Sequence, residues 1–339
     1  MKEEVTKAVI LVGGYGTRLR PLTYTLPKPL ICFCNKPILK YQIEKLVDAG
    51  IKEIILALNY HNELIVKEVS KYEQEFDIKI IYSKEDEPLG TAGPLALVKE
   101  HLKDTSFFLM NSDICCNANL REMKDSFMKS DCWGTILTYP VQDPTKYGLV
   151  SVEGSRIQSF LEKPKRIEGS GPWLINAGMY VLSSKVLDLI ELRETSIEHE
   201  VFPVLARDSR LDHFSFTGYW MDIGQPKDYL IGQVMELQNS KVADRHFDVE
   251  NNVVIGEHVR IGENCILKNC TIFDYALIED NCRIENSIIG WGCHIQKGCV
   301  IRSMSVLGEG VIVERGLEVD GLLSKPKTRV TSFTMLKEV

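Results

Sequence analysis

The chain has 339 residues, of which 44% are hydrophobic and 26% charged, and its formal net charge is −7. This composition is typical of globular proteins and argues against disorder, and the negative charge argues against broad binding to nucleic acid or anionic membranes. Because no apolar run approaches the ~18 residues of a spanning helix and the first four residues are not signal-like, we expect a cytoplasmic protein without a membrane partner.

Strand and helix patterns alternate over the first part of the chain. Lys7–Val12 is a short, β-branched apolar run that ends in glycines, as a buried strand does before a loop. Similar apolar runs occur at 53–58, 78–82 and 107–110, and helical patterns lie at 37–49, 61–75 and 92–101. Such alternation predicts βαβ units, and therefore an α/β, Rossmann-like domain with a mixed, mostly parallel sheet.

Later patterns complete the first predicted domain. Strands are expected at 147–152, 157–162 and 175–182, and a helix at 226–238. The polar stretch Asn239–Glu250 then indicates a linker. We expect a first domain over residues 1–240, a linker over 241–250 and a second domain over 251–339.

A repeat of about six residues follows this linker. Aliphatic residues recur from Ile255 to Val313 in steps of six, with two steps of five. This spacing is typical of hexapeptide repeats, in which three short strands form each coil of a left-handed parallel β-helix. Cysteines in this register, such as Cys282, Cys293 and Cys299, fit small buried apolar residues better than metal ligands.

The segment Leu11–Thr23 follows the first predicted strand and reads Leu-Val-Gly-Gly-Tyr-Gly-Thr-Arg-Leu-Arg-Pro-Leu-Thr. Its glycines let the backbone approach a nucleotide, and amide groups with Arg18 can hold a triphosphate. The segment has neither the Gly-Lys-Ser/Thr of a Walker A loop nor the Gly-x-Gly-x-x-Gly of a dinucleotide fold. Taken alone, it also fits an ordinary strand-to-helix turn.

Further motifs follow this segment in order. They are Pro27-Lys28-Pro29-Leu30, the run Glu85–Gly93, Asn111-Ser112-Asp113, Tyr147-Gly148, Phe160-Leu161-Glu162-Lys163-Pro164, Ile175–Tyr180 and Trp220–Pro226. With these motifs the chain resembles the sugar-1-phosphate nucleotidyltransferases over nearly its whole length. Within that family it is most similar to the branch that pairs GTP with mannose 1-phosphate, of catalytic beta type.

The resemblance implies that a nucleoside triphosphate is joined to a sugar 1-phosphate with release of pyrophosphate. GTP and mannose 1-phosphate would give GDP-mannose, an assignment that rests chiefly on the Glu85–Gly93 segment. Base selection depends on a few hydrogen bonds that spacing does not reveal. UTP or ATP with glucose 1-phosphate therefore stays open as an alternative.

The family's residue roles carry over as implications of this resemblance. The nucleotide would contact Leu11, Gly13, Gly14, Gly16, Thr17, Arg18, Lys28, Glu85, Gly90 and Asp113. The sugar phosphate would contact Gly148, Glu162, Lys163, Asn176 and Asp222. Mg²⁺ would be held by Asp113 and Asp222, and the catalytic cations would be Arg18, Lys28 and Lys163.

Physical chemistry agrees with this division of roles. Nucleotidyl transfer needs mainly position and charge neutralisation, magnesium prefers carboxylate and phosphate oxygens, and lysines offset the repulsion between two phosphorylated substrates. Each residue alone also fits a plainer role, as a turn aspartate, a solvated lysine or a backbone cap. The combination and order of the motifs favour the functional interpretation.

Two other classes of protein fit part of the pattern. An acyltransferase would use a β-helix, but this tail is short and has no evident catalytic histidine loop. A non-catalytic regulatory subunit that binds GDP-mannose is the stronger rival, and the unaltered Gly-Gly-Tyr-Gly-Thr-Arg loop argues against it. An exposed end coil favours homo-oligomerisation through the β-helix, with a regulatory relative as a further expected partner.

Overall fold

The computed structural model describes residues 3–58, 62–167, 169–239 and 246–332. The chain forms two compact units. The first unit contains the residues up to Gly14 together with Leu39–Trp220, and the second contains Tyr15–Ile38 and the residues from Met221 onward. Part of the expected linker at 241–250 lies outside the described residues.

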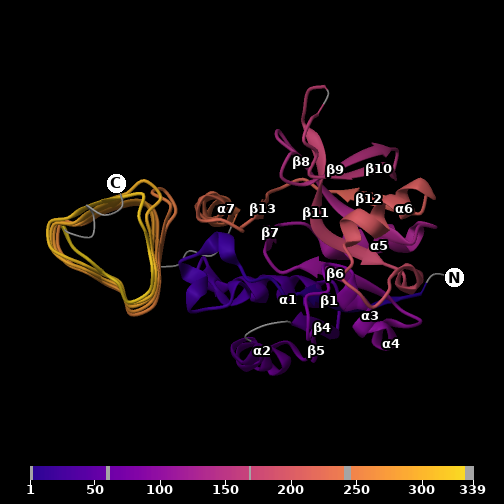
Figure 1. The fold of residues 1–339 in the computed structure, drawn as a ribbon, viewed down its shortest axis with the longest axis horizontal. Helices are drawn as coiled ribbons and strands as arrows, with labels where there is room; N and C mark the ends of the chain where they lie inside the picture. The colour runs from indigo at the N-terminus through magenta and orange to yellow at the C-terminus, as the bar shows by residue number, and fades with distance from the viewer. Residues whose placement is uncertain (1–2, 59–61, 168, 240–245, 333–339) are drawn as a thin grey trace. The chain divides into compact units, whose positions relative to one another are not determined.

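The first unit is built on one large sheet. Among the described residues this sheet has nine strands in the order β5-β4-β1-β6-β11-β8-β12-β10-β9, and Figure 1 shows its central strands side by side. The strands of this unit are β1 (Val5–Leu11), β4 (Glu53–Leu58), β5 (Lys79–Lys84), β6 (Ser106–Asn111), β7 (Ile114–Cys116), β8 (Gly134–Val141), β9 (Gly148–Glu153), β10 (Arg156–Glu162), β11 (Trp173–Leu182) and β12 (Leu211–Ser215).

The sheet is mixed, but the expectation that it is mostly parallel is wrong. Strands β5, β4, β1 and β6 are parallel neighbours, as βαβ units require. Beyond β6 the neighbours β11 and β8 run antiparallel, and β9 and β10 form a hairpin. The connection Gly154-Ser155 is too short for a crossover helix, so β9 and β10 must be antiparallel.

Helices connect most of these strands. The predicted helix at 92–101 is two short helices, because the backbone of Val98 (φ −108°, ψ 15°) leaves the helical region between them. No helix in the described part of the chain is long and apolar enough to cross a membrane. The helices of the first unit are α1 (Ile38–Asp48, which starts one residue before Leu39), α2 (Asn62–Phe76), α3 (Gly93–Leu97), α4 (Lys99–Leu102), α5 (Leu120–Lys129) and α6 (Phe202–Arg207).

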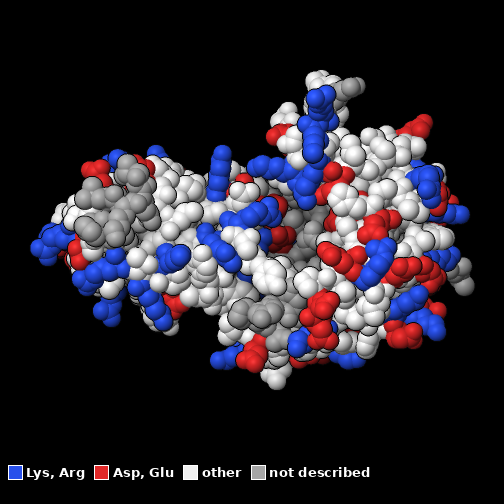
Figure 2. All heavy atoms as spheres, viewed as in Figure 1, with Lys and Arg blue, Asp and Glu red and all other residues white. Residues whose placement is uncertain are grey.

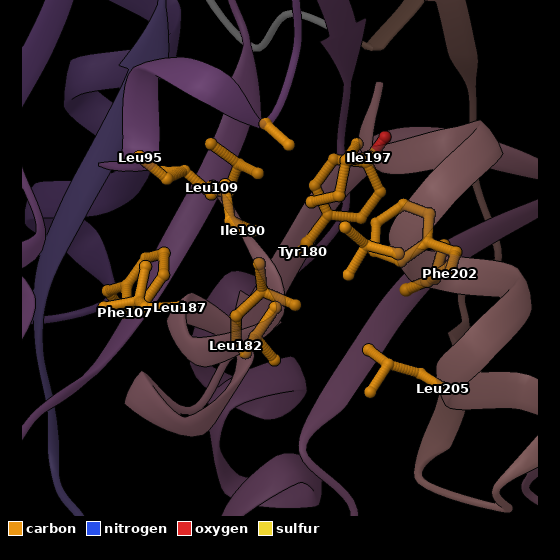
Figure 3. Close-up of a cluster of buried hydrophobic side chains, with 14 of the residues drawn as sticks. Leu95, Phe107, Leu109, Tyr180, Leu182, Leu187, Ile190, Ile197, Phe202 and Leu205 are labelled. Carbon is orange, nitrogen blue, oxygen red and sulfur yellow. The ribbon is translucent and has the colours of Figure 1, made fainter. Parts of the chain in front are cut away.

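The core of the first unit lies against the middle of the sheet. Figure 3 shows Tyr180 and Leu182 of β11 among apolar side chains from other elements, including Phe202 of α6. The rings of Tyr180 and Phe202 lie 4.9 Å apart at 48°. Full burial of such aromatic side chains stabilises the fold by about 1.5–3 kcal/mol each. The sheet is therefore a rigid support for the loops at its edge.

The second unit contains a stack of parallel strands. Val253 pairs with Cys270, and Cys270 pairs in turn with Ser287, so a strand meets the equivalent strand of the next coil 17 or, in some coils, 18 residues later. Figure 1 shows these residues (orange to yellow) tracing stacked triangular turns. The strands are β14 (Phe247–Asp248), β15 (Val253–Ile255), β16 (Arg260–Ile261), β17 (Ile266–Ile272), β18 (Leu277–Ile278), β19 (Arg283–Ile289), β20 (His294–Ile295), β21 (Val300–Arg302), β22 (Val306–Leu307), β23 (Ile312–Val313), β24 (Glu318–Asp320), β25 (Leu323–Ser324) and β26 (Arg329–Val330).

Repeat residues point into this stack, and special backbone conformations form its corners. Ile278, Ile284 and Ile295 are completely buried. At one corner Asn269 and Asn286 both have φ of 46°, a left-handed conformation that asparagine tolerates. The amide of Asn269 donates to the Oδ1 of Asn286 at 2.7 Å, which links successive coils.

The cysteines of the repeat are buried inside the stack. The Sγ atoms of Cys282, Cys293 and Cys299 approach backbone oxygens of the next coil at 3.3, 3.1 and 3.0 Å. Burial raises the pKa of the Cys293 thiol to about 12 and that of Cys282 to about 11. These side chains are neutral, packed thiols.

Helix α7 (Pro226–Asn239) packs against the stack within the second unit. The buried amide of Gln233 donates to the Cys270 carbonyl at 3.2 Å and to the Oδ1 of Asn252 at 3.1 Å, and the Oε1 accepts from Thr271. Near it, the ring of Tyr229 meets Phe273 at 6.4 Å. A single side chain therefore satisfies several buried polar groups.

Replacing Gln233 by Leu should destabilise the protein by about 1–3 kcal/mol, because buried hydrogen-bonding groups lose their partners. Urea unfolding followed by circular dichroism measures this change. Gln238→Leu is the matched control, because Gln238 lies on the same helix and is exposed. Equal stability of the two variants would contradict the role assigned to Gln233.

The remaining short elements of the second unit precede the tail in sequence. They are the 3₁₀ turns Thr17–Leu19, Leu22–Tyr24 and Lys28–Leu30 and the hairpin of β2 (Cys32–Phe33) and β3 (Lys36–Pro37). The strand β13 (Trp220–Asp222) leads into helix α7. The Asn35 amide donates to the Ile255 carbonyl at 2.8 Å, so this segment is attached to the first coil.

Candidate active site

Several predicted nucleotide residues lie at one edge of the sheet in the first unit. Strand β1 ends at Leu11 and is followed by Gly13 and Gly14, and β6 ends just before Asp113. Leu11 pairs with Asn111 in parallel register, so the carboxyl ends of both strands meet at this edge. Ligands of open α/β sheets bind at such an edge. A Cβ at Gly14 would meet no atom within 4 Å, so the loop leaves room for a ligand.

The Glu85–Gly90 segment follows β5 at the same edge. Glu85 is 6% exposed, and its Oε2 accepts from the backbone N–H of Leu89 at 3.0 Å. Burial raises the pKa of the Glu85 carboxyl. Gly90 has φ of 75°, and a Cβ there would lie 2.5 Å from the Thr195 carbonyl oxygen. Only glycine fits this close approach of two backbones.

The buried Glu85 predicts a pH-dependent stability. Its pKa is raised in the folded state, so the ionised form is disfavoured by folding and costs stability above the unfolded-state pKa. Glu85→Gln should therefore stabilise the protein at neutral pH and lose this advantage in acid. Thermal unfolding of both proteins at pH 4 and pH 7 measures the difference. The prediction would be contradicted if the difference in stability between Glu85→Gln and the wild type favoured the variant more at pH 4 than at pH 7.

Three predicted sugar-binding residues gather on adjacent strands of the first unit. Gly148 opens β9 and pairs with Glu162 at the end of β10. A Cβ at Gly148 would lie 2.6 Å from Phe160 Cζ, 2.9 Å from Glu162 Oε2 and 3.2 Å from Asn176 Cβ. A side chain at position 148 would therefore displace Phe160 or Glu162, so only glycine fits among these predicted sugar-binding residues.

A bulge in β11 sets the position of Asn176. The register of β11 against β8 shifts between Asn176 and Tyr180, where Gly178 has φ of 77°. Bulges of this kind re-aim side chains next to functional sites. Asn176 Nδ2 donates to the Tyr180 hydroxyl at 2.9 Å, and its Oδ1 accepts from the Gly178 N–H at 3.0 Å. Both ends of the Asn176 side chain are therefore held.

Lys163 directly follows this group. It has a left-handed backbone (φ 44°), and its Nζ lies 2.9 Å from Glu162 Oε1. The side chain is 66% exposed. Lys165 and Arg166 follow it in the loop after β10, and Figure 2 shows Lys and Arg spheres gathered at the loop that projects at the top of the view. This end of β10 presents positive charge, which suits a phosphate.

The second unit holds the remaining predicted residues. Gly16 has φ of 61°, and a Cβ there would lie 2.9 Å from Lys28 Cβ, so the two residues are close neighbours. Thr17 and Arg18 follow in the 3₁₀ turn Thr17–Leu19. Lys28 is 9% exposed, and the ammonium group of a lysine is a suitable partner for an anion.

Asp222 lies near Arg18 in the second unit. A Cβ at Gly224 would lie 2.8 Å from Asp222 Oδ1 and 3.1 Å from Arg18 Nη2. Gly224 therefore keeps the space beside the carboxylate and the guanidinium clear of side-chain atoms. The predicted phosphate ligand Arg18 and the predicted metal ligand Asp222 therefore lie close to each other.

Two residues at the first-unit site were assigned no role from the sequence: Thr91, inside the Glu85–Gly93 motif, and Glu198, outside all the motifs. Thr91 Oγ1 donates to Glu198 Oε2 at 2.6 Å, although 107 positions separate the residues. Glu198 lies in a π-helical turn, Ile197–Val201, a conformation often found at functional sites. A weak signal was present, since Thr195-Ser196-Ile197-Glu198 has the Ser/Thr-x-x-Glu spacing of a capping box.

Comparisons with known proteins show the family of this chain. A family model described as nucleotidyl transferase matches residues 7–239, and a second, described as GMPPB C-terminal domain, matches residues 230–339. The mannose-1-phosphate guanylyltransferase catalytic subunit beta of Danio rerio is 43% identical and is matched over 96% of this chain and 97% of that protein. A mannose-1-phosphate guanyltransferase of Schizosaccharomyces pombe is 41% identical, with 93% and 94% covered.

A solved structure is also similar to this chain in fold. The crystal structure of HddC from Yersinia pseudotuberculosis complexed with GMP-PN is 30% identical, with a TM-score of 0.56, and covers 66% of this chain and 96% of that one. The chain therefore belongs to the nucleotidyl transferase family, in the group that contains the mannose-1-phosphate guanylyltransferases.

Proposed function

We propose that this protein transfers a guanylyl group from GTP to mannose 1-phosphate. A phosphate oxygen of the sugar phosphate attacks the α-phosphorus, the bond between that phosphorus and the bridging oxygen to the β-phosphate breaks, and GDP-mannose and pyrophosphate form. The similarity to a mannose-1-phosphate guanylyltransferase over 96% of the chain supports these two substrates. The structural observation that supports the chemistry is the close grouping of Gly148, Glu162 and Asn176 on neighbouring strands.

Each residue of the proposed site then has a role. Gly13, Gly14 and the Glu85–Gly90 segment receive the nucleoside, and Glu162 and Asn176 hold hydroxyls of the hexose. Lys163 contacts the sugar phosphate, while Arg18 and Lys28 hold the triphosphate. Together these cations offset the repulsion between the two anionic substrates, which would otherwise oppose an in-line approach.

Magnesium is the metal that the donor set fits. Within the described residues no three His, Cys, Asp or Glu side chains converge to hold a metal. Mg²⁺ commonly uses one or two carboxylates and completes its shell with phosphates and water. Asp113 and Asp222 would hold it, with Gly224 leaving space beside Asp222. When bound, the ion neutralises charge on the phosphates and on the leaving pyrophosphate.

The tail has a separate proposed role in assembly. We propose that residues 251–339 form a left-handed parallel β-helix, with 1–240 as the catalytic domain, 241–250 as the linker and the cytoplasm as the location. The parallel register of 17 or 18 residues per coil supports the β-helix. We further propose homo-oligomers formed through the tail, with a regulatory relative as a second partner. Light scattering that shows only monomer at working concentration would argue against assembly.

The proposed activity is tested by pyrophosphate release from the purified protein with Mg²⁺. GTP, UTP, ATP and dTTP are each combined with mannose 1-phosphate and with glucose 1-phosphate. We expect clear preference for GTP with mannose 1-phosphate. Release with another pair would keep the reaction and change the substrates. Binding of GDP-mannose without any release would support the regulatory-subunit alternative.

A further inference from the structure

The carboxylate of Glu198 joins two segments of the first unit that are far apart in sequence. Its Oε2 accepts from Thr91 Oγ1 at 2.6 Å and from Ser196 Oγ at 2.9 Å. A hydrogen bond to an ionised acceptor is about twice as strong as a neutral one. Thr91 is therefore held by a strong contact directly after Gly90.

The backbone reinforces this contact. Gly90 and Thr195 form a parallel bridge, the Ala92 N–H donates to the Thr195 carbonyl at 2.9 Å, and the Thr195 N–H donates to the Leu89 carbonyl at 3.0 Å. The Ile197 N–H also donates to Thr91 Oγ1 at 2.9 Å. Residues 89–92 and 195–198 thus form one clamp, in which the Thr91 hydroxyl bridges backbone and carboxylate.

The turn that carries Glu198 begins near the hexose side of the site. Burial raises the pKa of the Tyr180 phenol, a residue of that side. Figure 3 shows Tyr180 beside Ile197, the neighbour of Glu198. The Tyr180 hydroxyl accepts from Asn176 at 2.9 Å. Glu198 therefore contacts Thr91 directly, and its neighbour Ile197 lies in the same buried cluster as Tyr180.

We propose that Glu198 is a positioning residue that, through Thr91, holds the Glu85–Thr91 segment in place and so sets the selectivity for the nucleobase. The proposal rests on the proposed function, which puts this segment against the base. Selectivity between bases depends on donors and acceptors at fixed positions, because a misplaced group leaves a buried polar atom unpaired. Glu198 need not contact the nucleotide to exert this effect.

The test compares Thr91→Val with Thr91→Ser in the full chain. Valine keeps the branched shape and removes the hydroxyl, whereas serine restores it. For the nucleotide that the wild type prefers, we expect Thr91→Val to lower the preference over the next-best nucleotide, measured as the ratio of kcat/KM values, by about tenfold. The KM for the sugar phosphate should stay unchanged, and Thr91→Ser should keep the wild-type ratio.

Glu198→Ala should reproduce the loss of selectivity seen in Thr91→Val. Glu200→Gln, on the same π-helical turn but exposed and paired with Arg193, is the control and should keep selectivity. An equal loss of kcat/KM for every nucleotide would overturn the proposal. So would an unchanged ratio of kcat/KM values in Thr91→Val and Glu198→Ala when their Tm is also unchanged. If the wild type prefers a nucleotide other than GTP, the base assigned above is wrong, while the variants still test the role of Glu198.

Discussion

Asp222→Asn should lower pyrophosphate release by about a hundredfold or more. The amide is nearly isosteric with the carboxylate but carries no charge to neutralise a divalent cation. Gly224 keeps side-chain atoms away from Asp222 Oδ1, and Arg18 lies on the same side of Gly224. The measurement is steady-state turnover over a range of Mg²⁺ concentrations, together with a thermal unfolding curve.

Asp113→Asn should have a similar effect, since Asp113 follows β6 at the sheet edge that carries Gly13 and Gly14. The matched control is Asp188→Asn, because Asp188 is exposed and pairs with Lys99 at 2.9 Å on the first unit. That variant should turn over normally. Near-normal turnover by both single variants, Asp113→Asn and Asp222→Asn, would contradict the assignment of these residues as metal ligands.

Gly148→Ala should lower kcat/KM for the sugar phosphate by about a hundredfold, since misplacement of about 1 Å can cost that much. The added methyl group would lie 2.6 Å from Phe160 Cζ and 2.9 Å from Glu162 Oε2, distances that force the side chains to move. Phe160 is 7% exposed, so its ring has little room to give way. The close approaches of the methyl group to Phe160 and to Glu162 would both move the Glu162 carboxylate, which is assigned to the hexose.

The expected loss of kcat/KM in Gly148→Ala concerns the sugar phosphate and not the nucleotide. The KM for the nucleotide should change little, because Glu85 and Gly90 belong to a different segment. Gly154→Ala is the control: its φ of 60° makes alanine strained, but no atom lies within 4 Å of the added methyl. It should reduce stability and leave substrate kinetics alone. A larger rise of the nucleotide KM than of the sugar-phosphate KM in Gly148→Ala would contradict the assigned pocket.

Elements with an apolar run or a helical period were predictable from sequence, whereas strand β12, whose pattern is interrupted by charged and polar residues, was not. The run at 53–58 is strand β4, and the pattern at 226–238 is helix α7 within one residue. Strand β12 was missed because Asp212 and His213 interrupt its pattern. Asp212 is nevertheless 5% exposed, since Arg156 Nε lies 3.4 Å from its Oδ1 and Ser130 donates to it. A distant partner makes its burial possible.

The sequence by itself determined the motifs and the repeat. Glycines at left-handed or crowded positions, such as Gly90 and Gly148, and the six-residue period of the tail are local properties, because backbone conformation and side-chain alternation act between near neighbours. The change from parallel to antiparallel neighbours in the sheet, the group formed by Gly148, Glu162 and Asn176, and the clamp between Thr91 and Glu198 were decided only by the tertiary structure. Their contacts join residues far apart in the chain, and only packing of the whole sheet sets which of these residues meet.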